Sequence, residues 1–260
     1  MGVVYKAEDV KLHRIVALKF LPENFTVSED ETARFQREAE AISALNHPNI
    51  ATIYEFDEAE GRKFLSLEFL PGGTLKAKVN RLLSRGEHFS LDEVLGYGIQ
   101  MADGLAHAHR RQIVHRDVKT DNVMLTEEGR VKITYFGLAK FKGATHLTRT
   151  GSTLGTAAYM SPEQIQGREA DNRSDLFSLG VVLYELTTCH LPFSGDHAGA
   201  LAYSILQKDP IPVDTYRKGV PESFVRVIRR CLEKDRATRY QSADEVAADL
   251  RSVQQNAGDQ

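Results

Sequence analysis

The sequence has 260 residues, of which 42% are hydrophobic, and this is enough to bury one large core or two smaller lobes. Its 33 basic and 36 acidic residues give a net charge of −3, so no overall positive charge attracts the chain to nucleic acid or anionic lipid. Cys189 and Cys231 lie in apolar segments, which is typical of reduced residues in a cytoplasmic protein. The most apolar stretch is too short to span a bilayer, so we expect membrane attachment only through flanking regions.

The first 70 residues predict a small β-rich lobe. Short runs of apolar and β-branched residues recur there, and one longer run has its apolar residues at helical spacing. The expected strands are residues 3–8, 15–21, 50–56 and 63–70, and the expected helix is residues 31–46. Pro71, Gly72 and Gly73 then interrupt the pattern and predict a hinge.

The residues after this hinge predict a larger helical lobe. Long segments with apolar residues at helical spacing follow one another towards the end of the chain. The expected helices are residues 91–111, 175–188, 197–207, 222–232 and 243–255. The runs 122–126 and 131–134 flank a turn-forming segment and predict a β-hairpin near the interlobe cleft. We therefore expect an α+β fold of one domain, residues 1–260, with lobes 1–70 and 71–260.

The segment HRDVKTDN, residues 115–122, is the most specific chemical signal in the chain. Asp117 can accept a proton, Lys119 can bind a phosphate, and Asn122 offers an oxygen ligand for a metal ion. A polar surface loop is the alternative interpretation. Because the three side chains can converge from one short loop, we favour phosphoryl transfer.

Together with other segments, this loop resembles the eukaryotic-type protein kinase domain of the Ser/Thr class, and it is most similar to bacterial Ser/Thr kinases. The resemblance covers nearly the whole chain. The matching segments are VALK at 16–19, REAE at 37–40, HPNI at 47–50, LEFLPGGTL at 67–75, GTAAYMSPE at 155–163, DLFSLG at 175–180 and KDRATRY at 234–240. The resemblance implies a bilobal protein kinase fold with ATP and Mg²⁺ as cofactors. It also implies that Ser/Thr of a protein substrate accepts the phosphoryl group.

The resemblance implies roles for residues of the first lobe and the hinge. Lys19 would bind the α and β phosphates, and Glu38 would orient it through an ion pair. Leu67 would be the gatekeeper beside the adenine pocket. The remaining nucleotide-binding positions would be the backbone around Glu68 and Leu70, the apolar walls Val4, Ala17 and Met124, and Gly2 of the glycine-rich loop.

Other positions would regulate or support the site. In the resemblance, Thr156 together with Lys119 indicates a kinase of the Ser/Thr class. The resemblance also implies a structural ion pair between Glu163 and Arg239. Arg116 would bind a phosphate on the activation segment. Thr148 and Thr150 are the expected phosphorylation sites. The spine that joins the two lobes would consist of Ile42, Ile53, His115 and Phe136.

Two positions depart from the family pattern. The glycine-rich loop GxGxxGxV retains only Gly2 and Val4, so we expect a lobe without its first strand and a weaker hold on the triphosphate. Tyr135 replaces the aspartate of Asp-Phe-Gly, and a phenol with a pKa of about 10 is neutral and a poor Mg²⁺ ligand. We therefore expect Mg²⁺ binding to be weakened or lost and phosphoryl transfer to be impaired.

Three explanations for Tyr135 compete: a pseudokinase shaped by selection, a kinase with an unusual metal site, and an isolated change in an active lineage. Because Lys19, Glu38, Asp117, Lys119 and Asn122 are all retained, we favour a recent loss or an isolated change over a long-established scaffold. The predicted function is thus a Ser/Thr protein kinase domain of reduced activity. The alternative is a pseudokinase that binds a nucleotide or a signalling partner without turnover.

Overall fold

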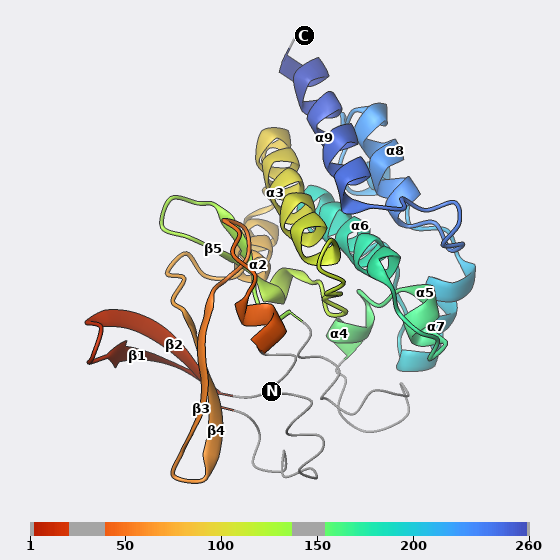
Figure 1. The fold of residues 1–260 in the computed structure, drawn as a ribbon. Coiled ribbons are helices and arrows are strands. Elements are labelled where there is room, and N and C mark those ends of the chain that lie inside the picture. Colours follow the sequence, from red (N-terminus) through yellow and green to blue (C-terminus); the bar gives the residue numbers. More distant parts are fainter. Residues whose placement is uncertain (1–2, 21–39, 137–153, 259–260) are drawn as a thin grey trace.

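The computed structural model describes residues 3–20, 40–136 and 154–258. Four strands gather at one end of the molecule and the long helices at the other (Figure 1). The strands are β1 Val4–Asp9, β2 Arg14–Phe20, β3 Ile53–Ala59 and β4 Arg62–Glu68, followed later by β5 Val123–Leu125 and β6 Val131–Ile133. The helices are α2 Leu75–Arg85, α3 Leu91–His109, α4 Leu154–Ala157, α5 Pro162–Ile165, α6 Asn172–Thr188, α7 Ala198–Gln207, α8 Glu222–Cys231 and α9 Ala243–Gly258, with 3-10 turns η2 Thr120–Asn122 and η4 Val213–Thr215. This confirms the α+β fold with a small sheet-based lobe and a larger helical lobe.

The described strands of the first lobe form an antiparallel sheet in the order β1-β2-β4-β3. The register places Ala17 of β2 opposite Leu67 of β4, and Lys19 two residues further along opposite Leu65. The strand expected at 50–56 begins later, at Ile53, because Ile50 forms a separate parallel bridge with Ile133 of β6. This bridge joins the first lobe to the hairpin β5–β6, whose formation confirms the predicted turn at 127–130.

Local signals in the sequence explain where the helices begin. The Ser90 hydroxyl accepts a hydrogen bond from the Glu93 N–H at 3.1 Å, and the Glu93 carboxylate accepts one from the Ser90 N–H at 3.0 Å, so a capping box starts α3. Helix α6 is apolar around most of its circumference and is buried along its whole length after the first turn. A helix of this kind belongs in the centre of a core, and α6 packs there against α3 and α8.

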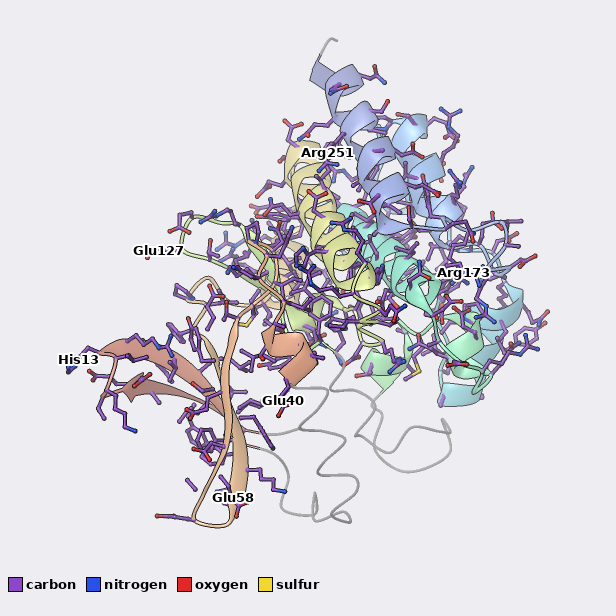
Figure 2. The ribbon with its side chains drawn as sticks, viewed as in Figure 1. His13, Glu40, Glu58, Glu127, Arg173 and Arg251 are labelled. Atoms are coloured by element: carbon purple, nitrogen blue, oxygen red, sulfur yellow. The ribbon has the colours of Figure 1, made fainter. Side chains whose placement is uncertain are left out.

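A surface ion pair joins the last helix to α3. Arg251 of α9 (Figure 2) donates to the carboxylate of Asp103 on α3, with an Nη2–Oδ2 distance of 2.7 Å.

Cys189 and Cys231 are free thiols buried in the helical lobe. Among the described helices, none combines the length and apolar character that crossing a bilayer requires.

Candidate active site

The loop 115–122 is fixed to the start of α6 by one buried carboxylate. The Oδ2 and Oδ1 atoms of Asp175 accept hydrogen bonds from the backbone N–H groups of His115 and Arg116, both at 2.8 Å. His109 of α3 also donates to this carboxylate, at 2.8 Å. Burial opposes ionisation of Asp175, but the His109 and backbone donors hold its pKa below the ordinary range. Asp175 is therefore an anion that anchors the loop.

The His115 ring connects this loop to the segment after β6. Its Nδ1 accepts the Asp117 N–H at 3.1 Å, so the proton lies on Nε2, which donates to the Thr134 carbonyl at 2.9 Å. Burial lowers the pKa of His115, which keeps this tautomer neutral. The ring also meets Phe136 edge-on, with 4.6 Å between ring centroids. Ile42, Ile53, His115 and Phe136, the expected spine residues, are all buried.

Polar contacts link four expected active-site residues in a chain, from Thr156 through Lys119 and Asp117 to Asn122. The Lys119 Nζ lies 3.0 Å from Asp117 Oδ1 and 3.2 Å from Thr156 Oγ1 of α4. The Asn122 side-chain nitrogen donates to Asp117 Oδ2 at 3.0 Å and to the Asp117 carbonyl at 2.7 Å. One carboxylate thus binds an ammonium and an amide at once, and the Asn122 oxygen remains as a ligand atom. This arrangement can neutralise a phosphate and accept a proton from a hydroxyl.

Tyr135 lies directly after β6, between two anchored neighbours. The Thr134 N–H and hydroxyl both donate to the Asn122 carbonyl, at 2.8 and 2.9 Å, while Phe136 is buried against His115. The backbone φ of Tyr135 is 63°, in the left-handed region that favours Gly, Asn and Asp over an aromatic residue. The sequence did not predict this conformation, which suits the aspartate that the family has here.

The Lys19 ammonium lies over the ring of Tyr135, 3.3 Å from its centroid. This distance is within the range of cation–π attraction. Burial raises the pKa of the Tyr135 phenol, so the ring is neutral at physiological pH. Motif reasoning placed both residues at the phosphate end of the site but did not predict their contact. Glu38, the expected partner of Lys19, lies outside the described residues, as do Gly2, Thr148 and Thr150.

The expected adenine pocket lies between β2, β4 and β5. Leu67 and Leu70 are buried, Ala17 and Met124 are half-buried, and Val4 is exposed. The hinge is tied to β5 because the Gly72 N–H donates to the Leu125 carbonyl at 3.0 Å and the Leu125 N–H donates to the Gly73 carbonyl at 2.9 Å. These bonds attach β5, which carries Met124, to the hinge that follows β4.

Motif reasoning missed an ion pair at the hinge. The Lys132 Nζ of β6 lies 2.8 Å from Glu68 Oε2, which also accepts the Thr52 N–H at 3.1 Å. These residues are far apart in the sequence, and no motif connects them. The pair joins the hinge to the hairpin that precedes Tyr135.

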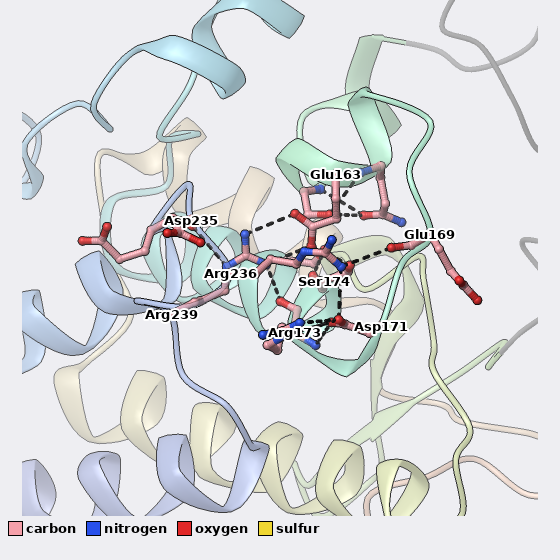
Figure 3. A network of polar contacts seen from close by, with 12 residues as sticks. Glu163, Glu169, Asp171, Arg173, Ser174, Asp235, Arg236 and Arg239 are labelled. Carbon is pink, nitrogen blue, oxygen red and sulfur yellow. Dashed lines mark hydrogen bonds and ion pairs between the residues drawn. The ribbon is translucent and has the colours of Figure 1, made fainter.

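The expected pair of Glu163 and Arg239 is present and fully buried (Figure 3). Arg239 Nη1 and Nη2 donate to the two Glu163 oxygens at 2.9 and 3.2 Å, and the Ser174 hydroxyl donates to Oε1 at 2.6 Å. This interaction fixes the end of the segment 155–163 against α6. The sequence predicted this ion pair.

A second buried network escaped motif reasoning. The carboxylate of Glu185 on α6 accepts hydrogen bonds from Thr120, at 2.9 Å, and from the Tyr159 hydroxyl, and it forms an ion pair with Lys76 of α2 at 2.6 Å. Thr120 belongs to the same loop as Asp117, and Tyr159 belongs to the segment that contains Thr156. The network therefore connects the loop that contains Asp117 to the segment that contains Thr156.

The donor set at position 135 does not fit Mg²⁺. Magnesium binds anionic and carbonyl oxygens, whereas the Tyr135 phenol is neutral and its ring contacts Lys19. Asn122 supplies an amide oxygen nearby. Across residues 3–20, 40–136 and 154–258, no group of three or more His, Cys, Asp or Glu side chains is arranged to hold a metal ion.

Comparison with known proteins identifies the family. The family model described as the protein kinase domain matches residues 1–250. The chain belongs to the protein kinase family. Members of this family in general use ATP and Mg²⁺ and act on proteins.

Relatives of this kinase domain are bacterial Ser/Thr kinases. It is 36% identical over 253 residues to the serine/threonine-protein kinase PrkC of Bacillus subtilis, covering 97% of this chain and 38% of that protein. It is 38% identical over 252 residues to the serine/threonine-protein kinase PknL of Mycobacterium tuberculosis, covering 97% of this chain and 62% of that protein. A probable serine/threonine-protein kinase of Clostridium perfringens is 37% identical over 256 residues, covering 98% of this chain and 37% of that relative. The chain thus spans less than two thirds of each relative.

Proposed function

We propose that this kinase domain transfers the γ-phosphoryl group of ATP to Ser or Thr of a protein, and that Tyr135 makes the transfer slow. The observation that carries the proposal is that the expected catalytic residues are in contact while the expected metal-binding anion is missing. Polar contacts link Thr156, Lys119, Asp117 and Asn122 in a chain, yet position 135 supplies a neutral ring instead of an anion.

The assembled residues support the following roles. Asp117 accepts the proton of the substrate hydroxyl, because its carboxylate is partly exposed at 15% and held in place by Lys119 and Asn122. Lys119 balances the charge of the transferred group, and Thr156 positions the Lys119 ammonium. Lys19 supplies a cation for the inner phosphates.

The adenine end of the site supports nucleotide binding independently of the metal. Val4, Ala17 and Met124 would provide apolar walls beside the gatekeeper Leu67, and the backbone around Glu68 and Leu70 would hydrogen-bond adenine. This recognition of adenine needs no anion at position 135. Since Tyr135 offers no anionic ligand, we propose that ATP binds weakly and almost independently of Mg²⁺. When bound, Mg²⁺ in this family neutralises phosphate charge, and this chain supplies fewer ligands for it.

The neutral ring at position 135 also favours a second candidate function. A domain that keeps its nucleotide pocket but lacks the metal-binding anion can act as a nucleotide- or partner-binding module in signalling. Phosphotransfer measurements discriminate between the two functions, because the module would bind ligands without turnover.

We extend the proposal to the rest of the chain. Residues 1–260 form one kinase domain whose lobes divide near residue 70, and the domain works in the cytoplasm. Arg116, whose carbonyl accepts a hydrogen bond from Gln164 at 2.9 Å, is the proposed receiver of a phosphate on Thr148 or Thr150. The partners of the domain are ATP and a protein substrate or signalling protein. Nucleic acid is not among them, and membrane contact would require flanking regions.

The proposed function is tested by restoring the anion. We expect Tyr135→Asp to raise phosphotransfer from radiolabelled ATP at least ~100-fold when the chain is preceded by a complete glycine-rich loop and first strand. Asp117→Asn in the same protein should abolish the gain, which excludes a contaminating kinase. Equal rates with and without the Tyr135→Asp substitution would show that residue 135 does not limit transfer.

A further inference from the structure

We propose that Tyr135 is a specificity-determining residue that holds the Lys19 ammonium on its ring, so that the site prefers adenosine-like ligands without phosphates over ATP. This inference rests on the proposed nucleotide site and adds a competition within it. A nucleotide with phosphates must draw Lys19 away from the ring, whereas a ligand without phosphates leaves the contact intact.

The geometry of the contact carries the first step. The Lys19 Nζ lies 3.3 Å from the Tyr135 ring centroid, well inside the distance of about 6 Å at which cation–π attraction becomes significant. Both residues are half-buried, and Tyr135 packs against the apolar core. Partial removal from water strengthens such an attraction, because solvent screens it less.

The backbone keeps the ring in this position. Thr134 is bound to the Asn122 carbonyl by two hydrogen bonds, and Phe136 is buried against His115, so both neighbours of Tyr135 are fixed. Tyr135 itself has a φ of 63°, a costly conformation that persists only where the surroundings enforce it. The backbone of Tyr135 therefore cannot shift without disturbing Thr134 or Phe136, and only rotation about the side-chain bonds can move the ring.

The charges decide which ligands compete. The contact is between an ammonium and an uncharged ring, and phosphate oxygens attract an ammonium more strongly than a ring does. ATP can therefore displace the ring, but it loses the energy of the cation–π contact in doing so. Adenosine binds the hinge and the walls at Ala17 and Met124, away from this exchange. Tyr135 thus lowers the affinity for ATP in two ways. It supplies no anionic ligand for Mg²⁺, and its ring holds the Lys19 ammonium that would otherwise bind the phosphates.

The contact itself can be observed without any nucleotide. Lysine amines carrying ¹³C-methyl groups give separate NMR signals, and a ring beneath the Lys19 amine shifts its signal upfield. We expect the shifted signal in the unaltered protein and in Tyr135→Phe, and its return to the ordinary position in Tyr135→Leu. Lys19→Arg removes the signal and so assigns it. An unshifted Lys19 signal in the unaltered protein would overturn the proposal.

The effect on ligands is measured by calorimetric titration with ATP and with adenosine, both without Mg²⁺. We expect Tyr135→Leu to raise the affinity for ATP about 3- to 30-fold, the range that typical cation–π energies correspond to, and to leave that for adenosine unchanged. Tyr135→Phe, which keeps the ring, should behave like the unaltered protein. In a Lys19→Met background the Leu substitution should change neither affinity.

Three results would contradict the inference: no gain for ATP in Tyr135→Leu, an equal gain in Tyr135→Phe, or a gain that survives Lys19→Met. If Tyr135→Leu does not fold, Tyr135→Asn replaces it, because Asn tolerates the left-handed backbone. Failure of every variant to bind either ligand would contradict the proposed nucleotide site together with the inferred preference. The lysine signal would still decide whether the ring holds Lys19, so the two failures are distinguishable.

Discussion

Arg239 is 1% exposed, and its guanidinium forms a bidentate pair with Glu163, which is 3% exposed. Burial opposes ionisation of Glu163, but the hydrogen bonds from Arg239 and Ser174 bring its pKa below the ordinary value. Each charge is tolerated in the interior because the other is present. Removing one partner therefore leaves a buried charge without compensation.

We expect Arg239→Met to lower the free energy of unfolding by roughly 3–5 kcal/mol, measured by urea denaturation. The double variant Arg239→Met, Glu163→Gln should recover much of this loss, since it removes both charges. A loss below about 1 kcal/mol in the single variant would show that water replaces the arginine and that the pair is not isolated from solvent.

Tyr135 shows the limit of prediction for a single residue. The sequence established that position 135 lacks an anion, because the surrounding motif fixes the alignment. It could not establish that the ring contacts Lys19, since this depends on the left-handed backbone and on the separation of β2 from β6. The same holds for Lys132 and Glu68, whose contact spans 64 positions in the chain.

Among the helices, two glycines test how closely neighbouring elements approach. A Cβ at Gly180 of α6 would lie 2.5 Å from the Cβ of Cys231, at the end of α8. A Cβ at Gly96 of α3 would meet nothing within 4 Å. Both positions are helical, so alanine has the same intrinsic advantage at each, and the packing decides the outcome.

We expect Gly96→Ala to stabilise the protein by about 0.5–1 kcal/mol and Gly180→Ala to destabilise it by about 1–3 kcal/mol, because α6 and α8 must then move apart. Thermal and urea unfolding of the matched pair provide the measurement. A stabilising Gly180→Ala would mean that α8 shifts easily and that the contact with α6 is loose.

The helix α2 shows what sequence reasoning overlooked among the elements. Thr74 caps its first turn by accepting the Ala77 N–H, and Gly86 ends it with a φ of 67°. Both signals were present in the sequence, yet the segment between them has only eleven residues, of which four are Lys or Arg. The longer helices were predicted because their apolar positions repeat over several turns. The short helix α4 contacts α7, and no local pattern in the sequence reveals that contact.

At the scale of the whole molecule, histidines make folding sensitive to acid. His47 and His107 lie with ring centroids 4.9 Å apart where α3 meets the segment before β3. Burial lowers the pKa of both rings, and Arg110 acts in the same direction on each. The other charged neighbours are Asp103 and Lys132 around His47, and Arg111 around His107.

Because the unfolded chain binds protons at these histidines more readily, their contribution to stability is complete above the ordinary histidine pKa of 6.5 and is lost as the pH falls below it. We therefore expect the temperature at the midpoint of thermal unfolding to decrease as the pH is lowered from 7 to about 5. The double variant His47→Gln, His107→Gln should show a weaker dependence, with buried His115 accounting for part of the remainder. An unchanged slope would assign the acid sensitivity to other groups.

The Glu185 network has a consequence for motion. One carboxylate receives donors from α2, from the loop that contains Asp117, and from the segment that contains Thr156. If one of these three pieces opens while the other two stay in place, the Glu185 carboxylate loses a donor while it remains buried, which is costly. Their amide protons should therefore exchange for deuterium at a common rate, as one cooperative unit, rather than as separate loops. Glu185→Gln would keep the shape of the side chain and remove its charge, and the three segments should then exchange at different rates.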